Sequence, residues 1–231
     1  MKINREELQK ALEIVKPGLA QKEMIEQTTS FAFLDDRVVT YNDEISISHP
    51  VPNMKINGAI KAEKLYGFLS RSKKKEINIQ IVEDQIKFVI GSAKAGIALQ
   101  NEIKLPLQEE IDTKGKWKKL PDGFRDALKL AYPNCSRDMS SPVMTCVNIC
   151  KSGKIEASDR LRLICCQVDE MPIPDFLIPA TSVSNLVRLP ITHISRGKGW
   201  AHFKTKEGTI FSCRIYQGEY PDTTTLYDVP G

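Results

Sequence analysis

The strongest constraint on the fold of this chain is that its sequence carries the same apolar pattern twice. A shift of 116 positions places residues 6–15 (EELQKALEIV) on residues 122–131 (DGFRDALKLA) without a gap. The apolar positions recur in order over about 100 residues at low identity, which indicates two copies of one structural unit. Further matched segments are 31–47 with 147–164, 60–69 with 178–187, and 76–90 with 191–205.

Each copy predicts the same succession of elements. Leu8, Ala11, Leu12 and Val15 have the spacing of one buried helix face, and Pro17 and the glycine after it end that helix. Alternating strands follow, and then a second amphipathic helix. The second helix is expected at 62–70 and 182–189, and the first strands at 31–33, 38–47, 147–149 and 155–168.

Two helices for eight or nine strands predict an α+β fold, in which each domain packs two helices on one face of an antiparallel sheet. The polar and charged stretch 106–120 has the composition of a linker. We therefore expect a first domain at 1–107, a linker at 108–120 and a second domain at 121–231.

Composition favours a folded protein without a membrane partner. Hydrophobic residues make up 41% of the 231 positions and charged residues 27%. No run approaches the roughly 18 apolar residues of a membrane span. The first ten residues lack the apolar core of a secretory signal. We expect a cytoplasmic protein.

The cysteines predict packing rather than chemistry. All six lie in the second half of the chain, and a cytoplasmic location predicts that they are reduced. Cys146 and Cys150 would supply only half of a metal site, and the three histidines lie in unrelated segments. We expect no metal and no other cofactor. The six residues are Cys135, Cys146, Cys150, Cys165, Cys166 and Cys213.

No catalytic motif is present, so we expect no enzymatic activity. The chain contains no phosphate-binding glycine-rich loop, no GxSxG and no HExxH. Asp43 and Asp159 fall at matched positions of the two copies. Equivalent positions of tandem domains lie far apart, so a local role is expected, in which each carboxylate accepts backbone hydrogen bonds in a turn.

Basic residues recur at the predicted helices of both copies, although the net charge is only +4. Two interpretations remain open: a solvated helix surface, or a surface that binds DNA phosphates without reading bases. Acidic residues on the same helices, such as Glu13 and Glu63, dilute the pattern. The candidate DNA-facing residues are Lys10, Lys22, Lys64, Arg71, Lys73, Arg125, Lys129, Arg137 and Arg188.

Several segments together resemble one known family. SDRLRL (158–163) resembles a Thr-Asp-Gly-His-Arg-Leu strand entry, IPATSVSNLVRL (178–189) a second helix, and TIFSCRIYQGEYPD (209–222) a closing strand that ends in Gly-Glu/Lys-Phe-Pro-Asp. MKINREELQKALEIV (1–15) and IKAEKLYGFLSR (60–71) match the start of the same family. The order of these motifs is similar to that of the bacterial DNA polymerase III beta subunit, the replicative sliding clamp, in a phage or otherwise divergent version.

The resemblance implies a ring with helices on its inner wall and sheet on its outer wall, so that the basic residues face duplex DNA. Lys22 falls where the family has a basic DNA-contacting residue after the first helix, and Arg137 lies in the equivalent loop of the second domain. The implied partners are a DNA polymerase and a clamp loader, bound through short hydrophobic peptides. Arg160 and Leu161 depart from the Gly and His that the family commonly has. The implied peptide pocket is Ser158, Asp159, Arg160, Leu161, Arg162 and Leu163.

The number of domains leaves the assembly open. Bacterial clamps have three such domains and this sequence has two, so either a third domain is missing or the chain is a two-domain clamp. Six domains close a ring, which implies a homodimer in the first case and a homotrimer in the second. A competing hypothesis is a clamp-like protein that forms no ring and acts as an interaction or DNA-repair scaffold.

Overall fold

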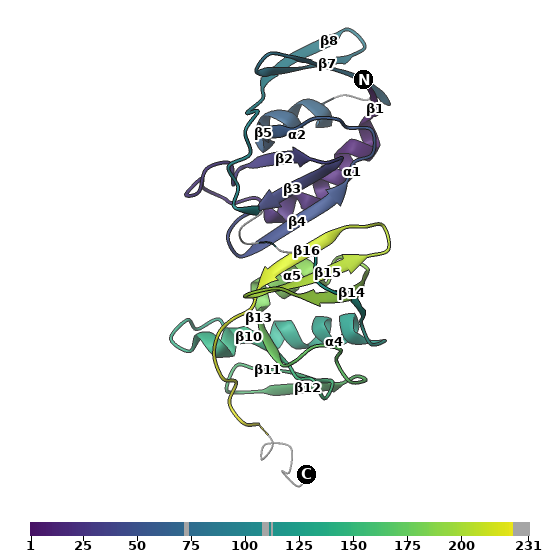
Figure 1. Cartoon of the computed structure of the whole chain (residues 1–231). Helices are drawn as coiled ribbons and strands as arrows, with labels where there is room; N and C mark the ends of the chain where they lie inside the picture. Colours follow the sequence, from purple (N-terminus) through teal and green to yellow (C-terminus); the bar gives the residue numbers. More distant parts are fainter. Residues whose placement is uncertain (72–73, 108–110, 112, 224–231) are drawn as a thin grey trace. The chain divides into compact units, whose positions relative to one another are not determined.

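The computed structural model describes residues 1–71, 74–107, 111 and 113–223 (Figure 1). This part of the chain is α+β, with four α-helices and antiparallel sheets, as the sequence predicted. No described helix is long and apolar enough to cross a membrane. Contacts divide the chain into two compact units, 1–114 with 202–212 (unit 1) and 115–201 with the residues from 213 onward (unit 2).

Unit 1 contains a four-stranded sheet in the order β1-β6-β7-β8, and its strands β5, β2, β3 and β4 pair with one another in that order. Residues 202–212 also belong to this unit, and they comprise most of β15 (Trp200–Thr205), the turn after it and most of β16 (Ile210–Arg214). Arg37 Nη2 donates a 2.7 Å hydrogen bond to the Gly208 carbonyl there. The elements are β1 (Lys2–Asn4), α1 (Arg5–Val15), β2 (Ser30–Leu34), β3 (Arg37–Tyr41), β4 (Ile45–Pro50), β5 (Gly58–Lys61), α2 (Ala62–Ser70), β6 (Glu76–Val82), β7 (Gln85–Ile90) and β8 (Ala93–Ala98).

Helix α1 forms where the apolar spacing predicts it. Asn4 caps its N-terminus, because the side-chain oxygen accepts hydrogen bonds from the backbone N–H groups of Glu6 and Glu7 at 2.9 and 3.4 Å. A 3-10 turn at Lys16–Gly18, with its proline, ends the helix. The buried side is the predicted one, made of Leu8, Ala11, Leu12 and Val15.

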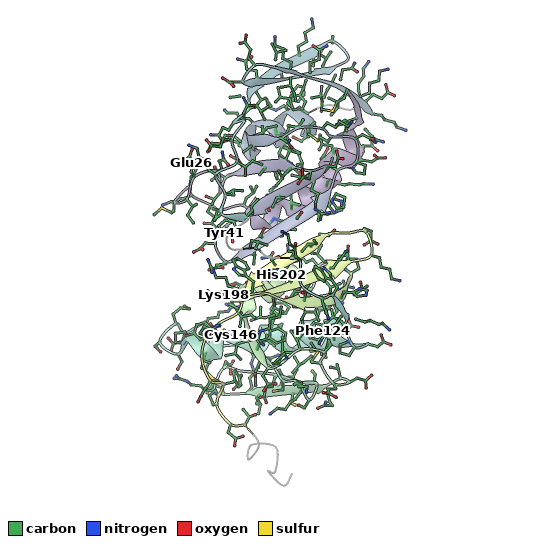
Figure 2. The ribbon with its side chains drawn as sticks, viewed as in Figure 1. Glu26, Tyr41, Phe124, Cys146, Lys198 and His202 are labelled. Carbon is green, nitrogen blue, oxygen red and sulfur yellow. The ribbon has the colours of Figure 1, made fainter. Side chains whose placement is uncertain are left out.

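Unit 2 contains a sheet with the order β12-β11-β10-β13, and β14 pairs with the short strand β9 inside the predicted linker. Tyr41 in unit 1 and Phe124 and Cys146 in unit 2 lie in the cores, and Lys198 lies on the surface (Figure 2). The elements are β9 (Lys118–Lys119), α4 (Phe124–Ala131), β10 (Cys146–Ile149), β11 (Lys154–Ser158), β12 (Leu163–Gln167), β13 (Phe176–Pro179), α5 (Ala180–Leu186) and β14 (Ile191–Arg196), with the first two residues of β15 and the last two of β16.

The two units repeat the same local order, a helix, four strands and a second helix, as the sequence indicated. The domain boundaries at 107 and 121 stay a prediction. Grouping by contacts divides the chain between Lys114 and Gly115 and adds 202–212 to unit 1. Residues 108–110 and 112 of the expected linker lie outside the described residues.

The matched register changes within the first hairpin of each unit. Ala32 pairs with Val39 in unit 1, and Asn148 pairs with Glu156 in unit 2. The offset between the copies is therefore 116 before the hairpin turn and 117 after it. The cause is a longer turn in unit 2, which needs residues 151–153 where unit 1 uses only Asp35 and Asp36.

The predicted single strands 38–47 and 155–168 are wrong, because each is broken by a turn. Asn42 Oδ1 accepts hydrogen bonds from the backbone N–H groups of Glu44 and Ile45 at 3.2 and 2.9 Å. Asp159 Oδ1 does the same for the residues two and three positions later, both at 3.1 Å. Such a side chain accepts hydrogen bonds from backbone N–H groups that would otherwise pair with a neighbouring strand, so the strand ends there. Asn42, rather than Asp43, is thus the partner of Asp159 in the repeat.

Candidate DNA-facing surface and partner site

The polar side of the unit 1 helices carries exposed cations. Lys10 on α1 and Lys64 on α2 are exposed, and Arg71 caps the C-terminus of α2. A cation at that end also complements the helix dipole. Of the predicted residues at this helix, Lys73 lies outside the described residues.

In unit 2 the candidate cations of the first helix are held by their own unit. Arg125 is half-buried, and its Nε donates a 2.9 Å hydrogen bond to the carbonyl of Val187, next to α5. Lys129 lies 2.8 Å from the carboxylate of Asp126. That hydrogen bond and charge lower the pKa of Asp126, so the pair is close to neutral at pH 7. Arg188, the remaining candidate, is exposed.

The loops that follow the first helix of each unit expose Lys22 and Arg137. Neither cation forms an ion pair with a side chain in the described part of the chain. An unopposed cation in solvent keeps its full charge for a phosphate. Lys22 and Arg137 therefore differ from Arg125 and Lys129, which have partners within their own unit, and the DNA-facing role of all four stays a prediction.

The predicted peptide pocket is a tight turn between β11 and β12. Ser158 Oγ accepts from the backbone N–H of Arg160 at 3.1 Å and donates to the carbonyl of Arg162 at 2.8 Å. Arg162 Nε lies 3.0 Å from the Asp159 carboxylate, which also accepts two backbone hydrogen bonds. Five of the six residues therefore share one local network or lie beside it, and Leu163 begins the next strand.

The two departures from the family pattern lie at the tip of this turn. Arg160 has a φ of 75°, a left-handed conformation that favours glycine. Its guanidinium donates to the hydroxyl of Ser141, which joins the turn to the preceding loop. Leu161 is 94% exposed, so a large apolar side chain faces solvent beside three charged neighbours. Peptide binding at this turn stays a prediction.

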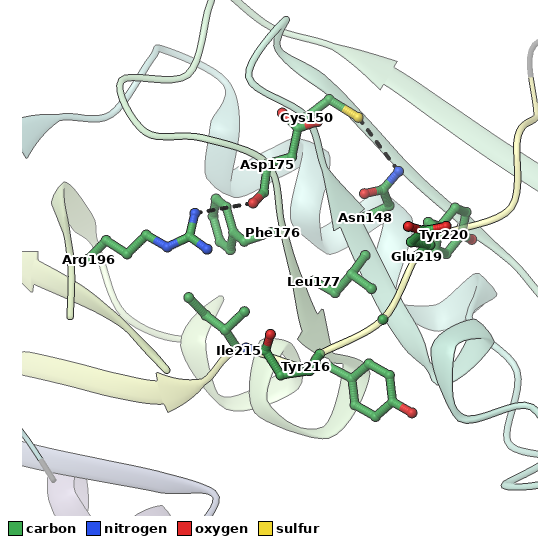
Figure 3. A pocket seen from close by; sticks show the side chains of 12 residues that line it. Asn148, Cys150, Asp175, Phe176, Leu177, Arg196, Ile215, Tyr216, Glu219 and Tyr220 are labelled. Carbon is green, nitrogen blue, oxygen red and sulfur yellow. Dashed lines mark hydrogen bonds between the residues drawn. The ribbon is translucent and has the colours of Figure 1, made fainter. Parts of the chain in front are cut away.

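A cavity that the sequence did not indicate lies in unit 2, with a volume of about 460 Å³ (Figure 3). Asn148, Cys150, Asp175, Arg196 and Tyr216 are among its lining residues. Arg196 Nη1 donates to the backbone carbonyl of Asp175 at 3.2 Å, and Asn148 Nδ2 lies 3.6 Å from the Cys150 sulfur. These side chains come from segments far apart in sequence, so no local motif marks the cavity.

A buried carboxylate lies beneath the chain segment that borders this cavity. Glu156 is 1% exposed and accepts hydrogen bonds from Asn148 Nδ2 at 2.8 Å and Thr223 Oγ1 at 2.6 Å. Lys154 Nζ lies 3.1 Å from the same carboxylate. A buried charge needs such partners. Glu156 thus ties residues near 223 to the sheet of unit 2.

Burial keeps two of the thiols protonated. All six cysteines are free. Burial raises the pKa of Cys135 to about 12 and of Cys146 to about 11, so both are neutral thiols at pH 7. Within the described ranges, no three side chains of His, Cys, Asp or Glu gather in a way that could hold a metal ion.

Comparisons with known proteins place the fold. No family model matches the sequence, and no curated protein matches it. Solved structures do match the chain. The DNA polymerase beta subunit from Streptococcus pyogenes has 21% sequence identity and a TM-score of 0.84, and the match covers 97% of this chain and 66% of that chain. The DNA polymerase sliding clamp from Bacillus subtilis has 18% identity and a TM-score of 0.80, with the same two coverages. The Helicobacter pylori beta clamp bound to a DNA ligase peptide is also similar (14%, 0.80, 98% and 69%). The chain has the fold of DNA polymerase III beta sliding clamps and spans about two thirds of their length.

Proposed function

We propose that this chain, which has the sliding-clamp fold, encircles duplex DNA and tethers a replicative polymerase to it. The observation that carries the proposal is the duplicated clamp unit with exposed cations on its helices and on the loops that follow them. Contacts between cations and phosphates hold DNA without reading its sequence, as sliding requires. The function needs no bond-making chemistry, and it places the protein in the cytoplasm with the replicated DNA.

The turn at residues 158–163 is the proposed site for polymerase and clamp loader. Leu161 offers an exposed apolar contact, and the loop with Ser141 lies beside it. A structurally similar clamp has been solved with a DNA ligase peptide, which supports binding of short peptides by this fold. We propose that Arg160 and Leu161 give this chain a peptide preference of its own.

The proposed ring requires more than one copy of the chain. Two clamp units per chain close a six-unit ring as a trimer, and a further unit on a longer chain closes it as a dimer. Analytical ultracentrifugation of the full-length protein at micromolar concentration distinguishes these assemblies from a monomeric scaffold. A monomer at all concentrations contradicts the ring.

Retention on circular DNA tests encirclement. Protein loaded on a nicked plasmid should remain bound through a gel-filtration column and leave once the plasmid is linearised, because a closed ring slides off a free end. Retention that survives linearisation would show ordinary DNA binding instead. A linear plasmid with blocked ends is the control, since it should retain the ring.

Substitution of the unopposed cations tests which residues face DNA. The variant with Lys22, Lys64, Arg71 and Arg137 changed to Ala should lower the slope of log affinity against log salt by about 3 to 4, since each phosphate contact contributes about 0.9. A charge-matched control changes four exposed lysines elsewhere and should leave the slope nearly unchanged: Lys87, Lys94, Lys198 and Lys206. Equal slopes for the two variants would contradict the DNA-facing assignment.

A further inference from the structure

The two loops that carry Lys22 and Arg137 share a tripeptide, although the 116-residue offset of the repeat places it one position earlier in unit 2. Unit 1 has Lys22-Glu23-Met24, and unit 2 has Arg137-Asp138-Met139. Each is a cation, a carboxylate and a methionine, and each lies in the loop after the 3-10 turn that ends the first helix. The pattern recurs although the two copies have low overall identity.

The middle carboxylate of each tripeptide is bound within its own unit. Glu23 pairs with Lys61 and accepts the backbone N–H of Gln27 at 2.7 Å. Asp138 accepts the backbone N–H of Ser140 at 2.9 Å and its hydroxyl at 2.6 Å. The negative charges are therefore engaged by local donors, while the neighbouring cations have no such partner among the described side chains.

The methionines point into solvent. Met24 is 89% exposed and Met139 is 71% exposed. A single exposed apolar side chain is ordinary, but one in the same loop of both copies, two residues after an unopposed cation, is a repeated feature. Core packing does not explain it, because neither side chain is in a core.

The loop tip, which is the exposed tripeptide of each unit, is flanked by residues that are held by hydrogen bonds and form the base of the loop. In unit 1 the buried Gln27 donates to the carbonyl of Glu102 at 2.7 Å and accepts the N–H of Lys104 at 2.8 Å. In unit 2 the N–H of Ser136 donates to the carbonyl of Met144 at 2.9 Å. A fixed base lowers the entropy that a tip loses on binding.

We propose that Met24 and Met139 are DNA contacts, each packing against sugars and base edges in a groove while the adjacent cation binds a phosphate. Methionine is suited to this role, because it is flexible and apolar and appears among the side chains that contact bases from the minor groove. It forms no directional hydrogen bond with a base, so the contact carries no sequence preference and does not stop sliding. The inference rests on the proposed DNA-binding function.

Salt dependence separates the two parts of the tripeptide. Met24→Ala with Met139→Ala should weaken duplex binding about three- to tenfold at every salt concentration, with an unchanged salt slope, because the contact releases no counterions. Lys22→Ala with Arg137→Ala should lower the slope by about 2. Met→Leu at both positions should keep the affinity, whereas Met→Gln, similar in length but polar, should lose it.

Oxidation footprinting provides a readout on the wild-type protein. Dilute hydrogen peroxide should oxidise Met24 and Met139 several-fold more slowly when the protein is on plasmid DNA, as measured by mass spectrometry of proteolytic peptides. Met1, which is 41% exposed and outside these loops, is the internal control and should be unaffected.

The outcomes distinguish this inference from the function on which it rests. Wild-type protein that holds plasmid DNA but shows no protection of the two methionines, and normal affinity in the Met→Ala variant, overturns the loop contact alone. Wild-type protein that binds no duplex DNA overturns the proposed function and this contact together. Loss of polymerase-peptide binding without loss of DNA binding in the Met→Ala variant also overturns the inference and assigns the tips to a protein partner.

Discussion

The hairpin β2–β3 in unit 1 and the hairpin β10–β11 in unit 2 occupy the same place in the repeat, yet they pair different chemistry. The ladder joins Ala32 to Val39 in unit 1 and Asn148 to Glu156 in unit 2. All but Asn148 are buried. The same hairpin backbone therefore accepts either an apolar or a polar cross-strand pair. In unit 2, Glu156 of the polar pair also accepts a hydrogen bond from Thr223.

The largest expected effect comes from removing the charged member of the polar pair. Glu156→Ala should lower the free energy of unfolding by about 3 kcal/mol, since Asn148, Lys154 and Thr223 lose a buried partner together. Urea denaturation of the full chain measures this loss.

Transplanting the unit 1 pair sharpens the same comparison. Asn148→Ala with Glu156→Val should lower the free energy of unfolding by less than half as much as Glu156→Ala does, because apolar replacement of a buried polar pair is often nearly neutral. Val39→Ala in unit 1 is the matched control for loss of side-chain volume. A double variant as unstable as Glu156→Ala would show that the loss comes from Lys154 and Thr223, which still lack their partner, and not from Asn148.

The turn after this hairpin gives a smaller contrast. Asp43 and Arg160 hold the same left-handed position, with φ of 73° and 75°. Aspartate tolerates that conformation better than arginine, and Tyr41 lies 3.1 Å from the Asp43 carboxylate. Arg160→Gly should therefore stabilise the protein by up to about 1 kcal/mol, while Asp43→Gly should not.

Thermal unfolding of the two glycine variants measures that difference, and peptide binding gives a second readout. Arg160→Gly also removes the contact with Ser141, so its affinity for a short hydrophobic peptide should change, whereas Asp43→Gly should bind as wild type. No stabilisation by Arg160→Gly would show that the arginine is not strained, and equal stabilisation by both variants would show that it is no more strained than Asp43.

The periodicity of apolar residues was sufficient to predict the helices and the existence of the repeat from the sequence. The second helix of unit 1 was predicted at 62–70, and α2 has those bounds. Its counterpart α5 begins two residues before the predicted 182 and ends three residues before the predicted 189. Apolar spacing is a local property of a helix, so these elements can be predicted without knowledge of their partners.

Side-chain hydrogen bonds with the backbone were the main source of error. The turns at Asn42 and Asp159 interrupt stretches whose alternation favours one continuous strand, and a longer hairpin turn in unit 2 shifts the register by one residue. The burial of Glu156 was also missed, because its partner Thr223 is far away in sequence. The roles of the DNA-facing and peptide-binding residues stay predictions.

The smallest expected effect is a pH dependence that should differ between equivalent positions on β4 and β12. The ladders place His49 of unit 1 where unit 2 has Cys166. Burial, with the nearby charge of Arg37, lowers the pKa of His49 despite an opposing contribution from Glu207. Because the pKa of His49 in the folded state lies below its unfolded value of about 6.5, the neutral form of His49 favours folding. This contribution to the free energy of unfolding is complete above pH 6.5 and is lost as the pH falls through the folded-state pKa.

Hydrogen–deuterium exchange mass spectrometry can follow each strand separately. After correction for intrinsic exchange rates, peptides covering 45–50 should exchange faster at pH 5 than at pH 7.5, because protonated His49 lies beside Arg37, whereas peptides covering 163–167 should not change. His49→Gln, which can still hydrogen-bond Thr209 but does not titrate, should abolish the pH effect on β4. The same acceleration in both strands would assign the effect to general acid destabilisation rather than to His49.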